Sequence, residues 1–244
     1  LSLVRAQFDN GNSKTGLKVE NLAISQYRRL GGDDVDRAIM AEAIWPQIEK
    51  HLGRLRATFS ANERQKVEDT LIPTVARRLK ERLCKAIKES KTGRRSSDAT
   101  ERLPVTFESI ELPRDFVLTE VQFRQIMLPF LIEPTDDYEG ALARPKSLLN
   151  PLIEVLERGG VEPHQLHAII LHGGSCKNPL VKELLSQSFG EHTARFYNTR
   201  IFETPNLDTS VARGAALAGY WRFERGVDIV QPIAAEEIGI LTLD

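Results

Sequence analysis

Apolar and polar residues alternate along the first 28 positions of the chain. Leu1 and Leu3, and later Leu17 and Val19, recur at every second position. A period of two is typical of a β-strand, because successive side chains point to opposite faces. Residues 11–16, rich in glycine and polar side chains, favour a turn between the two runs. The pattern predicts a two-stranded β-meander.

A helical pattern begins after residues 31–36, Gly-Gly-Asp-Asp-Val-Asp. The glycines suit a tight turn, and the aspartates suit a helix start, where unpaired N–H groups favour acceptors. The predicted helix carries apolar residues on one side: Val35, Ile39, Met40 and Ile44. The aspartates could also bind a cation, but capping explains them without one. We predict no metal site.

Residues 50–92 are predicted to be largely helical. Apolar residues of the second half recur at spacings of three and four: Val75, Leu79, Leu83, Ala86 and Ile87. Lysines and arginines fill the other face, as in a nucleic-acid-binding helix. Because Glu81 and Glu89 interrupt them, we interpret this face as solvated and predict no nucleic-acid partner.

The next segment combines a break, short apolar runs and a helix start. Residues 91–100 predict a polar break, and Val105–Leu112 and Phe116–Leu118 are typical of strands. Residues 119–122, Thr-Glu-Val-Gln, have the spacing of a capping box and predict a helix through Leu128.

Helices and strands alternate over the last hundred residues. An amphipathic helix is predicted over Leu148–Arg158, stopped by Gly159-Gly160, and a buried strand over Ala168–Leu171. A helix over about 180–189 and a strand containing Phe196 and Tyr197 come next. The last predicted element is a small-residue helix from Asp208 through Tyr220. This order predicts an α/β layer. Residues 45–130 break the rhythm and indicate an insertion.

Composition excludes few classes of function. The 244 residues are 41% hydrophobic and carry a formal net charge of -1, so no overall field favours nucleic acid or an anionic membrane. No apolar run reaches the roughly 18 residues of a membrane helix, so we predict no membrane partner. Two distant cysteines favour a reducing, cytoplasmic compartment. The start without Met predicts a fragment of a longer protein.

The strongest local signal for chemistry is residues 172–175, His-Gly-Gly-Ser, between a predicted strand and a helix. Glycines let a backbone approach a ligand, and helix starts attract phosphate, although a glycine pair also has purely structural uses. A serine esterase would need a G-x-S-x-G elbow, which the chain lacks. Cys176 has no paired histidine, and His164, His167 and His172 lack the partners of a metal set.

Four segments resemble, in order, the seventy-kilodalton heat-shock chaperones. They are residues 31–36, similar to G-G-x-D-F-D; 84–88, similar to C-E-x-A-K; 169–179, similar to V-L-V-G-G-S-T-R-I-P; and 206–216, similar to N-P-D-E-A-V-A-x-G-A-A. The spacing between the segments also fits, so the resemblance covers about residues 1–225.

The resemblance implies an α/β fold, lobe II of an actin-like, ribonuclease-H-like ATPase. Residues 1–44 and 145–226 would form subdomain IIA, a mixed sheet with flanking helices. Residues 45–144 would form the inserted α+β subdomain IIB, and residues 227–244 a C-terminal extension or linker.

The resemblance also implies a nucleotide site. Gly32 would border the phosphates, and Lys85 and Lys88 would lie at the ribose. The backbone of Gly173, Gly174 and Ser175 would pass the nucleoside and phosphates, with Lys177 against adenine and Asp208 beside the same loop. ATP or ADP with Mg²⁺ would bind the full-length parent, and the partners implied by this family are co-chaperones, nucleotide-exchange factors and client proteins.

Departures from the family pattern leave alternatives open. Lys85 stands where a ribose-binding Glu is usual, and Glu89 where a basic residue stacks on adenine. The fold could therefore serve as an interaction or regulatory module with nucleotide binding weakened or lost. Both phosphate loops and the catalytic lysine of lobe I are absent, so we predict no catalytic residue and no ATP hydrolysis in this fragment, while the parent would be an ATPase. A sugar kinase of the same superfamily is a third alternative.

Overall fold

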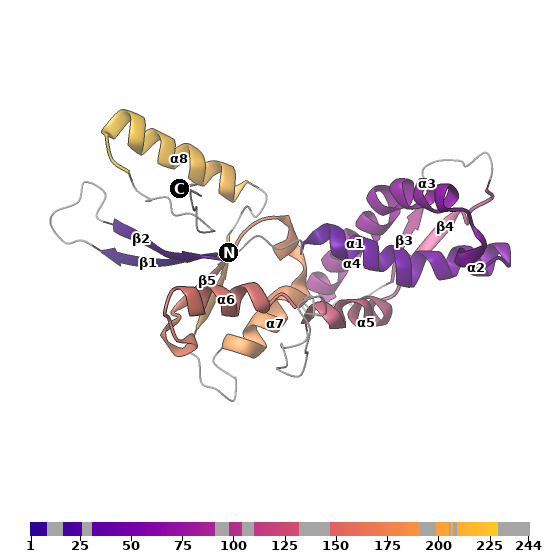
Figure 1. The fold of residues 1–244 in the computed structure, drawn as a ribbon, viewed down its shortest axis with the longest axis horizontal. Helices are drawn as coiled ribbons and strands as arrows, with labels where there is room; N and C mark the ends of the chain where they lie inside the picture. Colours follow the sequence, from indigo (N-terminus) through magenta and orange to yellow (C-terminus); the bar gives the residue numbers. More distant parts are fainter. Residues whose placement is uncertain are drawn as a thin grey trace, which may run out of the picture. The chain divides into compact units, whose positions relative to one another are not determined.

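A computed structural model describes residues 1–8, 17–25, 31–90, 98–103, 110–131, 147–190, 199–204, 206 and 209–228 (Figure 1). The chain divides into two compact units. Unit 1 contains residues 1–28, 133–176 and 180–244, and unit 2 contains residues 29–132 and 177–179. Across the described residues, no helix has the length and apolar character needed to cross a membrane.

Unit 1 begins with the predicted two-stranded meander. Strand β1 (Ser2–Phe8) pairs antiparallel with β2 (Leu17–Ile24), as Figure 1 shows. The register shifts between Leu3 and Val4, at one irregularity of the ladder. The turn predicted over residues 11–16 lies outside the described residues.

Helix α6 (Asn150–Arg158) packs against this hairpin. A Cβ atom at Gly159 would lie 2.5 Å from Cδ2 of Leu3 and 3.5 Å from Cβ of Ala23, so the absence of a side chain permits the close approach. Gly160 has a φ of +61°, the left-handed conformation in which helices commonly end. The predicted helix stop at the glycine pair is confirmed.

A second, parallel pair of strands completes the sheets described in unit 1. Strand β5 (Ala168–Leu171) pairs with β6 (Arg200–Glu203), and α7 (Pro179–Phe189) joins them along the chain. This order confirms the expected alternation of helix and strand. Strand β6 was not predicted, and the strand expected around Phe196 and Tyr197 lies outside the described residues.

Two expectations for these sheets are wrong. Strand β5 is predicted to be buried, but Ile170 is 62% exposed and only Leu171 of this strand is buried. One mixed sheet is expected over residues 1–44 and 145–226, whereas the described residues of these segments form two separate two-stranded sheets, β1–β2 and β5–β6. In a two-stranded sheet each strand has only one neighbouring strand. The apolar side chains of β5 therefore remain accessible to solvent.

The last helix of unit 1 is α8 (Ser210–Arg225). It contains the predicted run of small residues, and it extends five residues beyond Tyr220. Its left-handed C-cap is Gly226, with φ +62°. The predicted first residue, Asp208, lies outside the described residues.

Unit 2 starts with two helical rods, each containing a π-helical turn. The first rod is α1 (Gly32–Ile39), a π-turn at Met40–Ile44 and α2 (Trp45–Leu52). The second, which follows a short 3-10 turn at Arg56–Thr58, is α3 (Ala61–Leu71), a π-turn at Ile72–Ala76 and α4 (Arg77–Ser90). Pro46 and Pro73 lie at the two π-turns. Proline removes an N–H donor and crowds the preceding turn, and a wider turn accommodates it.

A small hairpin and a third rod complete unit 2. Strand β3 (Ala99–Arg102) pairs antiparallel with β4 (Asp115–Leu118), and α4 packs against both. Helix α5 (Glu120–Leu131) begins at the predicted capping box. The Thr119 hydroxyl accepts a hydrogen bond from the backbone N–H of Gln122 at 3.1 Å. The side-chain Oε1 atom of Gln122 accepts one from the backbone N–H of Thr119 at 3.2 Å.

Strand β3 lies where a polar break is predicted. Ala99 and Thr100 are the last two residues of the predicted break. Glu101 and Arg102, which follow them, are also polar, so no signal in the sequence indicated this strand. Of the run predicted as a strand over Val105–Leu112, residues 105–109 lie outside the described residues, and residues 110–112 form no strand.

The core of unit 2 confirms the two predicted apolar stripes. On the first rod Val35, Ile39, Met40 and Ile44 are all buried, and on the second Val75, Leu79, Leu83 and Ile87 are at most 1% exposed. Ala86, also predicted for the second stripe, is only half-buried. Other fully buried side chains are Trp45, Leu71, Phe116, Leu118, Phe123 and Met127. Each such side chain contributes about 1.5–3 kcal/mol through its removal from water.

The two cysteines should differ sharply in reactivity. Cys84 on α4 is 6% exposed, and burial raises the pKa of its thiol to about 12, whereas Cys176 is half-buried. Because the thiolate is the reacting species, a disulfide reagent at about pH 8 should modify Cys176 rapidly and Cys84 only on unfolding. Stopped-flow thiol titration with peptide mapping measures both rates.

Cys176→Ser is the matched control and should remove the fast phase while leaving the slow one. Modification of Cys84 at the rate of a small-molecule thiol in the folded protein would contradict the burial of this side chain.

Candidate functional site

The Gly-Gly-Ser turn leaves strand β5 by an abrupt change of backbone direction. Gly173 has a φ of +85°, a conformation that residues with a side chain adopt at a cost of about 1–2 kcal/mol. Gly174–Lys177 then form a 3-10 turn, and the Cys176 amide donates to the Gly173 carbonyl at 3.2 Å. Gly174 and Ser175 are exposed. The turn therefore presents accessible backbone, as a ligand-binding loop requires.

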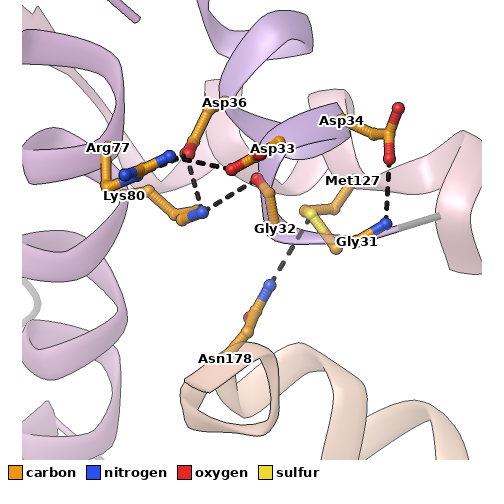
Figure 2. Close-up of polar contacts among 9 residues, drawn as sticks. All are labelled: Gly31, Gly32, Asp33, Asp34, Asp36, Arg77, Lys80, Met127 and Asn178. Carbon is orange, nitrogen blue, oxygen red and sulfur yellow. Dashed lines mark hydrogen bonds and ion pairs between the residues drawn. The ribbon is translucent and has the colours of Figure 1, made fainter. Parts of the chain in front are cut away.

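The end of this turn belongs to unit 2. Residues 177–179 group with that unit, in which Asn178 is 8% exposed. Its Nδ2 atom donates to Sδ of Met127 on α5 at 3.6 Å, as Figure 2 shows. Lys177 is exposed. This role of Asn178 was not predicted, because a polar residue before Pro179 does not signal it.

A buried carboxylate organises the start of α1 in unit 2 (Figure 2). The Asp36 side chain is fully buried. Nζ of Lys80 lies 2.7 Å from its Oδ1 atom, and Nε of Arg77 lies 3.1 Å from its Oδ2 atom. A buried charge requires such partners, because its loss of hydration is costly. Asp36 thus fixes two cations of α4 against α1.

The same two cations bind the rest of the first turn of α1. A terminal nitrogen of Arg77 lies 2.8 Å from Oδ1 of Asp33, and Nζ of Lys80 donates to the Gly32 carbonyl at 2.9 Å. The hydrogen bond to Asp36 is the main cause of a raised pKa of Arg77. Arg77 therefore remains a cation at any physiological pH.

The three aspartates at the start of α1 have different roles. Oδ2 of Asp34 accepts from the Gly31 amide at 2.9 Å, which confirms the predicted capping role there. Asp33 also lies in the first turn, as predicted, and it binds Arg77 of α4 as well. For Asp36 the prediction is wrong, because this buried carboxylate lies beyond the first turn and binds cations of α4. Within the described ranges, no three His, Cys, Asp or Glu side chains cluster as a metal site would require.

A second buried carboxylate uses two more cations of α4. Glu101 on β3 is 5% exposed, with Arg78 3.4 Å from its Oε1 atom and Arg82 3.0 Å from its Oε2 atom. The interpretation of the basic run as a solvated face is wrong for Lys80, which is 16% exposed, but it holds for Arg78 and Arg82, which are 55% and 62% exposed while they bind Glu101. Their charge serves the fold of unit 2.

The remaining predicted contacts of unit 2 lie on or against α4. Lys85 is exposed and Lys88 is half-buried. Residues three apart share one side of a helix, so their side chains are neighbours. Gly32 is half-buried, and Lys80 of the same helix binds its carbonyl. Unit 2 thus brings Gly32 to the helix that carries both lysines.

The other predicted contacts are in unit 1 or outside the description. Gly173, Gly174 and Ser175 form the turn after β5. Asp208 lies outside the described residues. Nucleotide binding by any of the predicted residues stays a prediction.

The roles of the residues that order this part of unit 2 were not predicted: Asp36, Arg77, Arg78, Lys80, Arg82 and Glu101. One signal for Asp36 was present, since it follows Val35 and precedes Ile39 by three residues on the apolar side of its helix. A charged residue at such a position needs a buried partner. The sequence does not say which of the many basic residues supplies it.

Two comparisons with known proteins identify part of the chain. A family model described as "Hsp70 protein" matches residues 141–238. A relative from Pyricularia oryzae, named as a heat shock protein, is 31% identical over 99 residues, which are 41% of this chain and 14% of that protein. The chain thus spans about one seventh of the length of this relative. The family match contains the Gly-Gly-Ser turn and residues 206–216.

The buried position of Asp36 predicts a large loss of stability in an Asp36→Ala variant. Removing one partner of a buried ion pair costs about 3–5 kcal/mol, and we expect about 3 because the Arg77 side chain is 43% exposed. Urea unfolding followed by the fluorescence of buried Trp45, in a Trp221→Phe background, reports on unit 2.

The matched control is Asp33→Ala, which removes a 77% exposed carboxylate that binds the same arginine. Exposed pairs contribute about 0–1 kcal/mol, so this variant should unfold near the wild-type midpoint. Equal midpoints for the two variants would show that burial of Asp36 does not stabilise unit 2.

Proposed function

Since its match over residues 141–238 makes the chain a member of the Hsp70 family, we propose that it contributes the adenosine and phosphate side of the ATP-binding domain of a longer, chaperone-like protein. One observation carries the proposal. The accessible turn at Gly173–Ser175 lies within the family match, and its backbone geometry favours glycine at residue 173. Turns of this kind suit close contact with a nucleotide.

Charge supports the same proposal. In unit 2, Lys85 and Lys88 place two ammonium groups on one side of α4, beyond the four cations that bind Asp36 and Glu101. Lys177 is exposed at the end of the turn. Ammonium groups are common ligands of phosphate and of ribose hydroxyls. Gly32 and Asp208 complete the proposed set.

The finer assignments belong to the same proposal. The fold would be lobe II of an actin-like ATPase, with subdomain IIA at residues 1–44 and 145–226 and the inserted subdomain IIB at residues 45–144. ATP or ADP with Mg²⁺ would bind the longer protein, which would act as the ATPase. Its partners would be co-chaperones, nucleotide-exchange factors and client proteins in the cytoplasm.

The proposal predicts saturable binding of ATP by the full-length protein in the presence of Mg²⁺. Calorimetric titration should give a measurable heat, and Lys88→Met should weaken binding about tenfold, the effect of losing one hydrogen bond to a charged group. The control Lys66→Met removes an exposed lysine of α3 and should leave affinity unchanged. No heat at millimolar ATP would overturn the proposal.

A second function is favoured by the charges at residues 85 and 89. Lys85 and Glu89 are both exposed on α4, and each has the charge opposite to that usual in the family. Such reversals remove the carboxylate that binds the ribose and the cation that stacks on adenine in that family. On this alternative, the fold is an interaction or regulatory module in which nucleotide binding is weakened or lost.

The double variant Lys85→Glu, Glu89→Arg separates the two functions. If the reversals abolished binding, the variant should regain ATP affinity by at least about tenfold, because two contacts to charged or polar groups are restored. The single variants provide the controls. An unchanged affinity, measured by the same titration, would contradict the alternative.

A further inference from the structure

We infer that Gln47 protects the outer edge of strand β4, which would otherwise pair with β4 of a second copy of this chain. Among the described residues, β4 pairs with β3 alone, so its other edge has no neighbouring strand. A free edge carries N–H and C=O groups to which another strand can bind. The inference concerns unit 2 alone and does not depend on the proposed nucleotide site.

The hydrogen bonds of the β3–β4 ladder show which backbone groups face outward. The N–H of Leu103 donates to the carbonyl of Arg114 at 2.7 Å, so these opposed residues form a hydrogen-bonded pair. Hydrogen-bonded and non-hydrogen-bonded pairs alternate along an antiparallel ladder. Three positions along the register, Thr100 and Val117 therefore form a non-hydrogen-bonded pair. The N–H and C=O groups of both residues point away from the neighbouring strand.

The side-chain amide of Gln47 on α2 binds both outward groups of Val117. Its Oε1 atom accepts from the Val117 N–H at 2.9 Å, and its Nε2 atom donates to the Val117 carbonyl at 2.8 Å. A primary amide carries both an acceptor and N–H donors, so it imitates a residue of a neighbouring strand. Nε2 also donates to the carbonyl of Ala43 at 2.8 Å, which anchors the amide to the first rod.

The remaining outward positions of this hairpin are protected as well. On β3, the Thr100 carbonyl accepts from a terminal nitrogen of Arg82 at 2.8 Å. The other outward positions of the two strands are Arg102 and Asp115, which are exposed and charged. Charged residues at an edge discourage pairing with a further strand. Each edge thus combines one side chain from a helix with one charged residue, as expected of edges that are kept from other strands.

A second copy of β4 suits the edge that Gln47 covers. In an antiparallel arrangement centred on Phe116, the outward groups of Asp115 would face those of Val117 from the second copy, and conversely. Like charges opposite each other would destabilise such a pair, but here each Asp115 lies opposite a valine. Val117 is also β-branched and 37% exposed, which favours its place in a wider sheet. The edge is therefore complementary to itself once the Gln47 amide is removed.

The variant Gln47→Ala tests the inference, because it removes the amide from the edge. In the full-length protein, the association constant for dimer formation should rise at least about tenfold over wild type, since the hydrogen bonds to Gln47 no longer have to be broken. Sedimentation velocity over a range of protein concentrations measures it. Gln125→Ala, which removes an exposed glutamine of α5, is the matched control and should sediment as wild type.

A second substitution, Val117→Pro in the Gln47→Ala background, distinguishes strand pairing from other kinds of association. Proline removes the outward N–H of residue 117 and leaves the hydrogen bonds between β3 and β4 in place, as at other edge positions that tolerate proline. The double variant should sediment as wild type. Thermal melts establish that each variant is folded, and Gln47→Met, which keeps an unbranched stem, replaces Gln47→Ala if the latter is not.

Each outcome decides the question. Dimer formation by the single variant that Val117→Pro abolishes would support the inference. A folded Gln47→Ala or Gln47→Met protein that sediments as wild type would overturn it, because the uncovered edge would then attract no second copy. Association that persists in the double variant would overturn it too, since that contact would not use the edge of β4. None of these results bears on ATP binding, so the proposed function is tested separately.

Discussion

The buried charge of Asp36 is the constraint on which the described part of unit 2 most depends. A carboxylate that is fully removed from water is tolerable only with cations at close range. Arg77 and Lys80 supply them from α4, and the same groups reach Asp33 and the carbonyl of Gly32. One anion thus connects α1 to Arg77, the first residue of α4, which lies 41 residues after Asp36 in the chain.

This constraint gives α4 two roles along its length. Four of its cations, in the order Arg77, Arg78, Lys80 and Arg82, neutralise the buried carboxylates of α1 and β3. Farther along the helix, Lys85 and Lys88 are the residues that we propose for the nucleotide. A helix fixed by charge at its first half can present the second half in a defined place. In unit 1, we propose the backbone of the Gly-Gly-Ser turn for the nucleotide, without a charged side chain.

The features that could be predicted from the sequence depend on neighbouring positions. The stripes of α1 and α4, the capping box at Thr119 and the stop at Gly159-Gly160 each follow from residues within a few positions of one another. Their physics is local: helix period, a hydroxyl that caps an amide, and a glycine that adopts positive φ. These predictions were therefore confirmed.

Features that depend on distant partners were missed. The pairing of Asp36 with Arg77 and Lys80 joins residues about forty positions apart, and many other basic residues could have served equally well on sequence grounds. Strand β3 is polar because Glu101 finds its cations on α4, so its pattern resembles a loop. Similarly, the apolar run of β5 predicted burial, but a second strand alone leaves Ile170 62% exposed. The family motifs suggested the nucleotide site, which stays a prediction. The structure gives the positions of the suggested residues only within each unit.

Hydrogen–deuterium exchange of the full-length protein, with and without ATP and Mg²⁺, tests the central claim most directly. The account predicts that ATP slows exchange in peptides covering residues 31–36, 84–90 and 172–177. Unchanged exchange in all three segments at saturating ATP would contradict the claim that they contact the nucleotide.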